Sequence, residues 1–181
     1  MELIKNLKDI TLIKKFTFAF LATILLAISA KIKIPFYPVP MTMQTFTVLL
    51  IGIIFGWRLG LFTIGFYLVE GLLGFPVFAG TPEKGLGISY FVGPTMGYLI
   101  GFLFAVFFAG YFNFNNNYIL NFIKLTIAVS TIYLLGMLGL IKFTGFEKVF
   151  IVGAQPFLLA ELFKILLLTT LIPYLLKFRK N

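Results

Sequence analysis

Two acidic residues lie within apolar stretches of the sequence, where they could contact a ligand inside a membrane. Glu161 has Lys164 three residues further along the chain, and Glu70 stands near the end of another apolar stretch. Residues three apart share one face of a helix. The pair predicts either a polar clamp, with Lys164 on a ligand carboxylate and Glu161 as acceptor, or a self-neutralising pair packed inside the protein. For Glu70, a ligand contact and an interfacial carboxylate facing water both stay open.

An amide and several aromatic side chains form a second set of candidates. Gln44 offers a donor and an acceptor, either to a ligand or to a neighbouring helix. Phe78, Tyr90, Phe91 and Tyr98 lie within or beside a glycine-rich segment. An aromatic pocket with a few polar groups suits a small amphipathic molecule.

The residue types that the chain lacks exclude several kinds of chemistry. The sequence has no cysteine and no histidine, which removes disulfides, thiolate metal sites, cysteine nucleophiles and histidine acid–base catalysis. The phosphate-loop pattern G-x-x-x-x-G-K-[ST] does not occur, nor do G-x-S-x-G and H-E-x-x-H. We therefore expect a binding protein and not an enzyme, with no catalytic residue, no metal and no cofactor.

The composition indicates that lipid surrounds most of the chain. Of the 181 residues, 60% are hydrophobic and 12% are charged, whereas soluble domains carry about 25% charged residues. A membrane helix needs about 20 mostly apolar residues, and the apolar stretches fit about six. We expect an all-α polytopic membrane protein, a bundle of about six transmembrane helices that forms one domain over residues 1–181.

Residues that break helices separate the expected spans. Lys31–Ile34 alternate polar and apolar side chains, and Pro35, Pro38 and Pro40 favour extended backbone. A tight turn is expected at 56–60 and a polar turn at 113–117. The approximate spans are 16–30, 42–55, 59–73, 93–112, 118–141 and 156–176, after a basic amphipathic segment at 1–15.

The distribution of charge predicts how the chain lies in the membrane. The formal net charge is +9, and the basic residues cluster at both ends: Lys5, Lys8, Lys14, Lys15, Lys177, Arg179 and Lys180. Such clusters mark the cytoplasmic side, so both termini are expected there and no nucleic acid is expected as a partner. The connections at 31–41, 74–93 and 142–155 then share the outer face, where they could form a lid over a pocket.

Three motifs resemble those of one known family. The run Pro35–Thr45 (P-F-Y-P-V-P-M-T-M-Q-T) resembles the P-x-x-P-V-P-[IM]-T-[LM]-Q-T signature of the biotin S-component family, BioY. The run Gly74–Gly80 resembles its G-[LF]-P-V-F-A-G loop, and Gly93–Phe102 resembles its G-P-T-G-G-Y-L-[IL]-G-F segment. The motifs match in order and spacing, and the likeness extends over nearly the whole chain.

This resemblance implies a high-affinity biotin-binding subunit of an energy-coupling factor transporter in a bacterial cytoplasmic membrane. Such subunits hold biotin near the outer face, under the loops after the first and third spans. They associate with a transmembrane coupling protein and two ATP-binding cassette ATPases. The resemblance implies ligand contacts at Glu161 and Lys164, and the residue types and positions add Gln44, Phe78, Tyr90 and Tyr98 as expected contacts. We expect the biotin carboxylate near Lys164 and the ureido group near Gln44. Ala19 and Thr23, a small-xxx-small pair, would dock the coupling protein.

The sequence departs from the family pattern in two places. The family's P-G-D-L-[IL]-K stretch maps onto Leu159–Lys164, where Glu161 replaces an aspartate and Leu159-Ala160 replace Pro-Gly. Met96 replaces a glycine in the third motif. Three alternatives stay open. An S component for another small vitamin is one, because pocket details decide the ligand and the fold does not. A membrane-embedded enzyme is opposed by the lack of histidine and cysteine, and a structural subunit without a ligand is opposed by the clustered Gly/Pro loops. Ligand competition, turnover of a bound molecule and the clustered outer loops would distinguish these alternatives.

Overall fold

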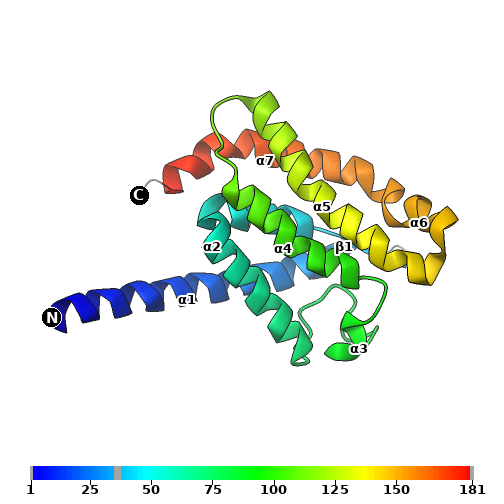
Figure 1. Cartoon of the computed structure of the whole chain (residues 1–181), viewed down its shortest axis with the longest axis horizontal. Helices are drawn as coiled ribbons and strands as arrows, with labels where there is room; N and C mark the ends of the chain where they lie inside the picture. The colour runs from blue at the N-terminus through cyan, green and yellow to red at the C-terminus, as the bar shows by residue number, and fades with distance from the viewer. Residues whose placement is uncertain (1, 35–37, 180–181) are drawn as a thin grey trace.

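The protein is helical throughout most of its length (Figure 1). The structure, a computed structural model, describes residues 2–34 and 38–179. Its elements in chain order are α1 (Glu2–Lys31), β1 (Lys33–Ile34), β2 (Met41–Thr42), α2 (Gln44–Leu72), α3 (Ile88–Phe91), α4 (Met96–Tyr111), α5 (Tyr118–Thr144), α6 (Phe146–Gly153), the 3-10 helix η1 (Gln155–Phe157) and α7 (Leu158–Arg179).

The first helix is longer than the expected first span. α1 runs without interruption from Glu2 to Lys31, so the expected basic segment and the first span form one helix. Its N-terminal part extends beyond the rest of the molecule (Figure 1). The marked N- and C-terminal ends lie toward the same side of the view, and α3 and α6 lie away from them (Figure 1).

A bend at Gly56 divides α2 into two arms that fold back on each other. Gly56 has φ 72° and ψ 172°, a conformation that glycine adopts without the steric cost of a Cβ atom. A Cβ built on Gly60 would lie 3.7 Å from the Cα of Gly52. Residues eight apart in a straight helix are about 12 Å apart along the axis, so the chain reverses here. The turn expected at 56–60 is confirmed, and it places the two ends of α2 on the same side of the bundle.

Small residues let α4 pack closely against both α2 and α5. A Cβ on Gly110 would meet the Trp57 amide nitrogen at 2.3 Å, and a Cβ on Gly97 would meet the Leu135 carbonyl oxygen at 2.2 Å. Membrane helices associate through such close backbone contacts. α4 therefore stands at the centre of the bundle, where its first turns can line a cavity.

The connections between the helices agree with the expected breaks. Lys33 pairs with Thr42 and Ile34 with Met41 in a two-stranded antiparallel ladder, so the chain leaves the helix where the alternating pattern begins. Pro35 lies outside the described residues. Asn117 caps α5 by accepting a hydrogen bond from the Leu120 amide at 3.0 Å. The connection expected at 142–155 is mostly helical, since α5 continues to Thr144 and α6 follows.

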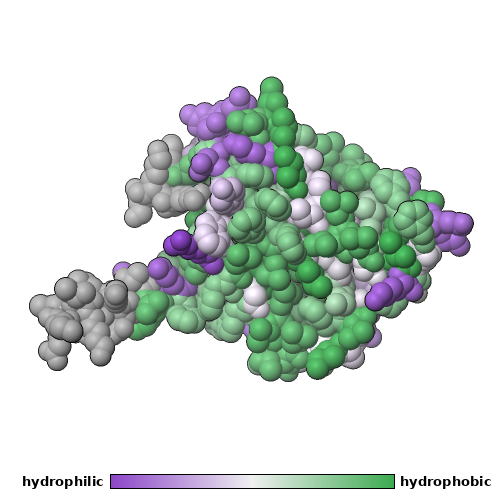
Figure 2. Space-filling view, in the orientation of Figure 1, coloured by the Kyte–Doolittle hydropathy of each residue, from purple (hydrophilic) through white to green (hydrophobic). Residues whose placement is uncertain are grey.

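The outer surface is that of a membrane protein. Within the described residues, four helical segments are long and apolar enough to cross a membrane: Leu12–Lys31, Gln44–Leu72, Tyr118–Thr144 and Phe146–Leu176. α4 is apolar but shorter. In Figure 2, hydrophobic residues cover most of the face that is shown, and hydrophilic residues gather toward its edges. Large apolar side chains such as Ile119, Leu159 and Phe163 are exposed, which fits contact with lipid.

Candidate ligand-binding site

A cavity lies between the start of α2, the first turns of α4, the middle of α5 and α7. The Gly-rich connection between α2 and α4 and the segment before α2 contribute the remaining wall. Its lining residues are Val39, Pro40, Met41, Thr42, Gln44, Thr45, Ala79, Tyr90, Thr95, Tyr98, Leu99, Phe102, Ile132, Tyr133, Phe157, Glu161 and Lys164. The wall combines apolar and aromatic side chains with a few polar groups, the composition of a small-molecule site.

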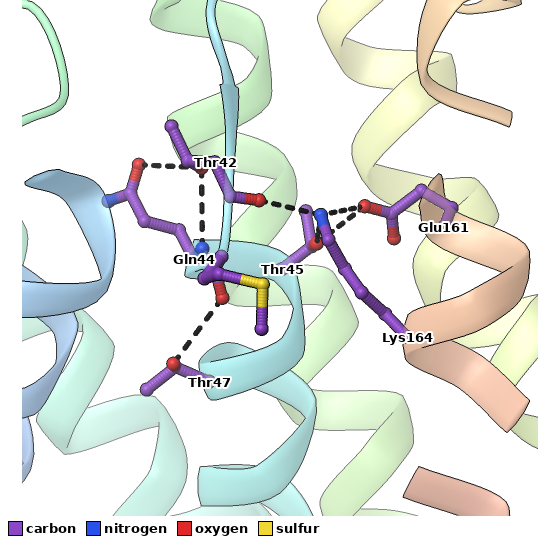
Figure 3. Close-up of polar contacts among 7 residues, drawn as sticks. Thr42, Gln44, Thr45, Thr47, Glu161 and Lys164 are labelled. Carbon is purple, nitrogen blue, oxygen red and sulfur yellow. Dashed lines mark hydrogen bonds and ion pairs between the residues drawn. The ribbon is translucent and has the colours of Figure 1, made fainter. Parts of the chain in front are cut away.

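Four polar residues of the cavity wall, Thr42, Thr45, Glu161 and Lys164, form one cluster (Figure 3). Glu161 Oε1 accepts hydrogen bonds from Lys164 Nζ and from Thr45 Oγ1, both at 2.6 Å. Glu161 is 4% exposed and Lys164 is 7% exposed. The two charges compensate each other, which makes their burial in an apolar bundle tolerable.

Lys164 uses all of its hydrogen-bond donors within the protein. Its Nζ donates to the Thr42 carbonyl oxygen at 2.6 Å, to Thr45 Oγ1 at 3.0 Å and to Glu161 Oε1. An ammonium group has three donors. The expected contact between Lys164 and a ligand carboxylate therefore requires that one of these hydrogen bonds be exchanged.

Two polar atoms of the cavity wall have no hydrogen-bond partner among the described residues. They are Glu161 Oε2 and Thr95 Oγ1, although the Tyr133 hydroxyl interacts with the Glu161 carboxylate. A buried polar atom without a partner is costly, so such atoms need an explanation. Glu161 Oε2 can only accept when ionised, whereas Thr95 Oγ1 can donate or accept. The cavity thus suits an organic ligand that brings hydrogen-bond donors.

Gln44 occupies the first position of α2 and connects the cavity to the glycine-rich connection. Its Nε2 donates to Tyr67 Oη at 2.7 Å, and Tyr67 Oη donates to the Val77 carbonyl oxygen at 2.8 Å. Its Oε1 accepts from Thr42 Oγ1 at 3.4 Å. Gln44 lines the cavity, and its side chain also forms the structural link that was the alternative interpretation.

The expected aromatic residues take three different positions. Tyr90 and Tyr98 line the cavity. Tyr98 Oη donates to the Gly153 carbonyl oxygen at 2.7 Å, which fixes α4 to the end of α6. Phe78 does not line the cavity. It is fully buried beneath Tyr90, with ring centroids 5.2 Å apart, and it packs on Gly71, where a Cβ would lie 2.0 Å from the ring.

Several wall residues were not among the predicted site residues. Thr42 and Thr45 belong to the motif Pro35–Thr45, and Thr95 belongs to the motif Gly93–Phe102. Their place in the family motifs could have indicated them as site residues. Tyr133 comes from the middle of α5 and Phe157 from η1, where no local pattern distinguishes a wall residue from any other apolar position.

The two residues expected to dock a partner lie inside the protein. Ala19 and Thr23 are each 1% exposed, and Thr23 Oγ1 donates to Glu70 Oε1 at 3.1 Å. Their side chains pack between α1 and α2, and docking of a partner at these two residues stays a prediction. Glu70 lines a separate apolar groove beside α1 and takes no part in the cavity.

The two departures from the family pattern differ in position. Met96 is 39% exposed and does not line the cavity, whereas Glu161 lies within it. Met96 therefore leaves the wall unchanged. Glu161 brings its carboxylate to the centre of the polar cluster.

The ionisable groups of the cavity do not suit a metal ion. Glu161 is the one carboxylate among the wall residues that the structure describes. Within the described residues, no three side chains of the histidine, cysteine, aspartate or glutamate type gather closely enough to bind a metal ion.

Comparison with known proteins places this architecture in a family. The BioY family profile matches residues 4–181. A protein of Pyrococcus horikoshii named as a probable biotin transporter BioY is 38% identical over 151 residues, which cover 83% of this chain and 89% of that protein. The biotin transporter BioY of Thermotoga maritima is 43% identical over 77 residues, 42% of this chain and 44% of that protein.

The fold also has a counterpart among solved structures. The crystal structure of an S-component for biotin from an ECF-type ABC transporter matches with a TM-score of 0.79 at 24% identity, covering 92% of this chain and 93% of that one. Fold and composition together define a helical membrane protein with a cavity enclosed among its helices. The chain belongs to the BioY family.

Proposed function

We propose that this protein is the biotin-binding S component of an energy-coupling factor transporter. The observation that carries the proposal is the likeness to the Pyrococcus horikoshii protein, a probable biotin transporter, over 89% of that protein's length. The cavity supports it, because its mostly apolar and aromatic wall includes the buried Glu161 carboxylate, whose Oε2 can accept a hydrogen bond from a ligand. The protein binds its ligand without converting it chemically.

The unpartnered atoms suggest how biotin lies in the cavity. The ureido ring of biotin carries two N–H groups and one carbonyl oxygen. Its N–H groups fit Glu161 Oε2, and Thr95 Oγ1 can bond the same polar ring. Tyr90, Tyr98 and Tyr133 offer apolar and stacking contacts to the fused rings.

This orientation differs from the one that the sequence led us to expect. Gln44 already has partners for its Nε2 and its Oε1, so it is a weaker site for the ureido group than Glu161. A biotin carboxylate on Lys164 would have to replace one of three hydrogen bonds within the protein. The ureido ring therefore lies at the polar cluster and the carboxylate toward the outer loops.

The same proposal assigns the membrane arrangement and the partners. The two arms of α2 and the shorter α4 cross the bilayer together with α1, α5 and α7, which makes a six-helix bundle over one domain. Both termini lie on the cytoplasmic side of the cytoplasmic membrane, supported by the basic ends of the sequence. A transmembrane coupling protein and two ATP-binding cassette ATPases supply the energy.

Equilibrium binding to the purified protein in detergent tests the ligand directly. We expect biotin to bind, and riboflavin and thiamine, at the same concentrations, not to compete with labelled biotin. Biotin methyl ester, which keeps the ureido ring, should compete, because the carboxylate does not lie at Lys164. If a folded sample does not bind biotin, the proposed function is wrong. If another vitamin binds selectively, that vitamin is the ligand instead.

A further inference from the structure

Two lysines at the end of α1 and in β1 bind main-chain oxygens of the glycine-rich connection. Lys31 Nζ donates to the Thr81 carbonyl oxygen at 2.7 Å and to the Phe78 carbonyl oxygen at 3.0 Å. Lys33 Nζ donates to the Ala79 carbonyl oxygen at 2.9 Å. The connection at 78–81 is thus fixed from one side by ammonium groups of the preceding segment.

A third lysine makes the same kind of contact in the opposite direction. Lys84 belongs to the glycine-rich connection, and its Nζ donates to the Pro38 carbonyl oxygen at 3.1 Å, in the segment between β1 and β2. Each of the two segments therefore holds the other. We call these three residues, Lys31, Lys33 and Lys84, the lysine clasp.

The segments that the clasp joins form the wall of the cavity. Val39 and Pro40 directly follow the carbonyl bound by Lys84, and Ala79 supplies the carbonyl bound by Lys33; all three residues line the cavity. Tyr90 also lines it, and its Oη accepts from the Gly80 amide at 3.1 Å. Separation of the two segments would open this wall.

The clasp differs from the polar cluster in its contact with water. Its three lysine side chains are exposed, whereas the carbonyl-bearing residues Phe78, Ala79 and Thr81 are buried. An exposed ammonium can exchange a carbonyl oxygen for water at small cost, so these hydrogen bonds can break and form without unfolding the bundle. Glu83 also acts electrostatically on Lys31, opposed by the like charge of Lys33.

We propose that the lysine clasp controls how fast the cavity opens and closes over its ligand, and that Lys31, Lys33 and Lys84 act as positioning residues through the two segments. The clasp is made by the protein alone, so it holds the wall both without and with ligand. Its loss therefore accelerates association and dissociation together and changes the equilibrium affinity little. The kinetic part rests on the proposed function, with biotin as the ligand.

Hydrogen exchange without ligand tests the clasp independently of biotin. In Lys31→Met and Lys84→Met variants, amide exchange over 39–43 and 75–87 should rise about tenfold, as expected when a local opening becomes easier. Lys31→Arg and Lys84→Arg keep the positive charge and the hydrogen-bond donors, so their amide exchange rates should stay close to those of the parent protein. Lys124→Met is the matched control, because Lys124 also donates to a main-chain oxygen, that of Asn113, at the turn between α4 and α5.

Stopped-flow binding of fluorescent biotin supplies the second readout. In the Lys→Met variants, the association and dissociation rates should each rise about tenfold, with the Kd changed less than about threefold. A merely structural role would instead raise the Kd without faster association. That result, or unchanged exchange in both Lys31→Met and Lys84→Met, would overturn the proposal. Faster exchange in a protein that does not bind biotin would retain the clasp and reject only biotin as the ligand.

Discussion

The protein places two carboxylates in apolar helices and surrounds them differently. Glu161 in α7 is 4% exposed, and one of its oxygens accepts hydrogen bonds from both Lys164 and Thr45. Glu70 in α2 is partly exposed, and the hydroxyl of Thr23 is its hydrogen-bond donor at 3.1 Å. Glu161 faces the cavity, whereas Glu70 faces the groove beside α1.

The difference shows what brings a carboxylate in a membrane helix into an enclosed cavity. An ionisable residue within a membrane helix is by default a candidate for function, and both glutamates meet this condition. Glu161 has a cation one helical turn away and lies on the face that the other helices enclose. Glu70 is two residues from the end of α2, where a carboxylate can reach the interface. A nearby compensating charge and enclosure by other helices therefore distinguish the two positions.

The largest effect is expected from removing the cation of the enclosed pair. Lys164→Met leaves the Glu161 carboxylate buried without its charged partner, and such a loss costs about 3–5 kcal/mol of stability. We expect a corresponding drop in the free energy of unfolding, measured by reversible denaturation in mixed micelles. The double variant Lys164→Met with Glu161→Met should recover most of this loss without recovering biotin binding. A double variant as unstable as the single one would show that packing, and not charge, is lost.

A smaller effect is expected when Glu161 keeps its shape and loses its charge. Glu161→Gln retains an oxygen that can accept from Lys164 and Thr45, but it removes the charged acceptor at Oε2. Because hydrogen bonds to charged groups contribute about 1.5–3 kcal/mol, the Kd for biotin should rise about 10- to 100-fold, measured by isothermal titration. Glu147→Gln, on the exposed start of α6, should leave the Kd unchanged. Equal affinity of parent and Glu161→Gln would exclude Oε2 as the ureido acceptor.

The smallest effect is expected at the second carboxylate. Glu70→Gln keeps an acceptor for Thr23 and lies outside the cavity, so the free energy of unfolding should change by less than about 0.5 kcal/mol. The Kd for biotin should stay within about twofold of the parent. A loss of affinity comparable to that of Glu161→Gln would remove the distinction between the two sites.

Much of the fold could be predicted because it depends on local patterns. The apolar stretches, the break after Lys31, the turn at Gly56 and the asparagine turn each follow from residues close together in the chain. The continuity of α1 was missed because polarity changes near residue 15, although no proline or glycine breaks the helix there.

The site was harder to predict because it depends on contacts between distant segments. The pairing of Glu161 with Lys164 could be predicted from helical spacing. The hydrogen bond between Glu161 and Thr45 joins residues 116 positions apart, and no local sequence pattern indicates it. The burial of Ala19 and Thr23 depends on which face of α1 meets α2. The Phe78 ring packs against Gly71, where only glycine leaves room for it, and this contact could not be read from either position alone.

The acceptors of the lysine clasp have a consequence for how related sequences can diverge. All three lysines bind main-chain carbonyl oxygens, and every amino acid supplies the same oxygen. Mutations at Ala79 or Thr81 can therefore accumulate without loss of the acceptor, as long as the backbone keeps its path. Selection for the lysine clasp would act on the three lysines that donate these hydrogen bonds. Related sequences could therefore differ at many positions of the glycine-rich connection and keep the same contacts between the two segments.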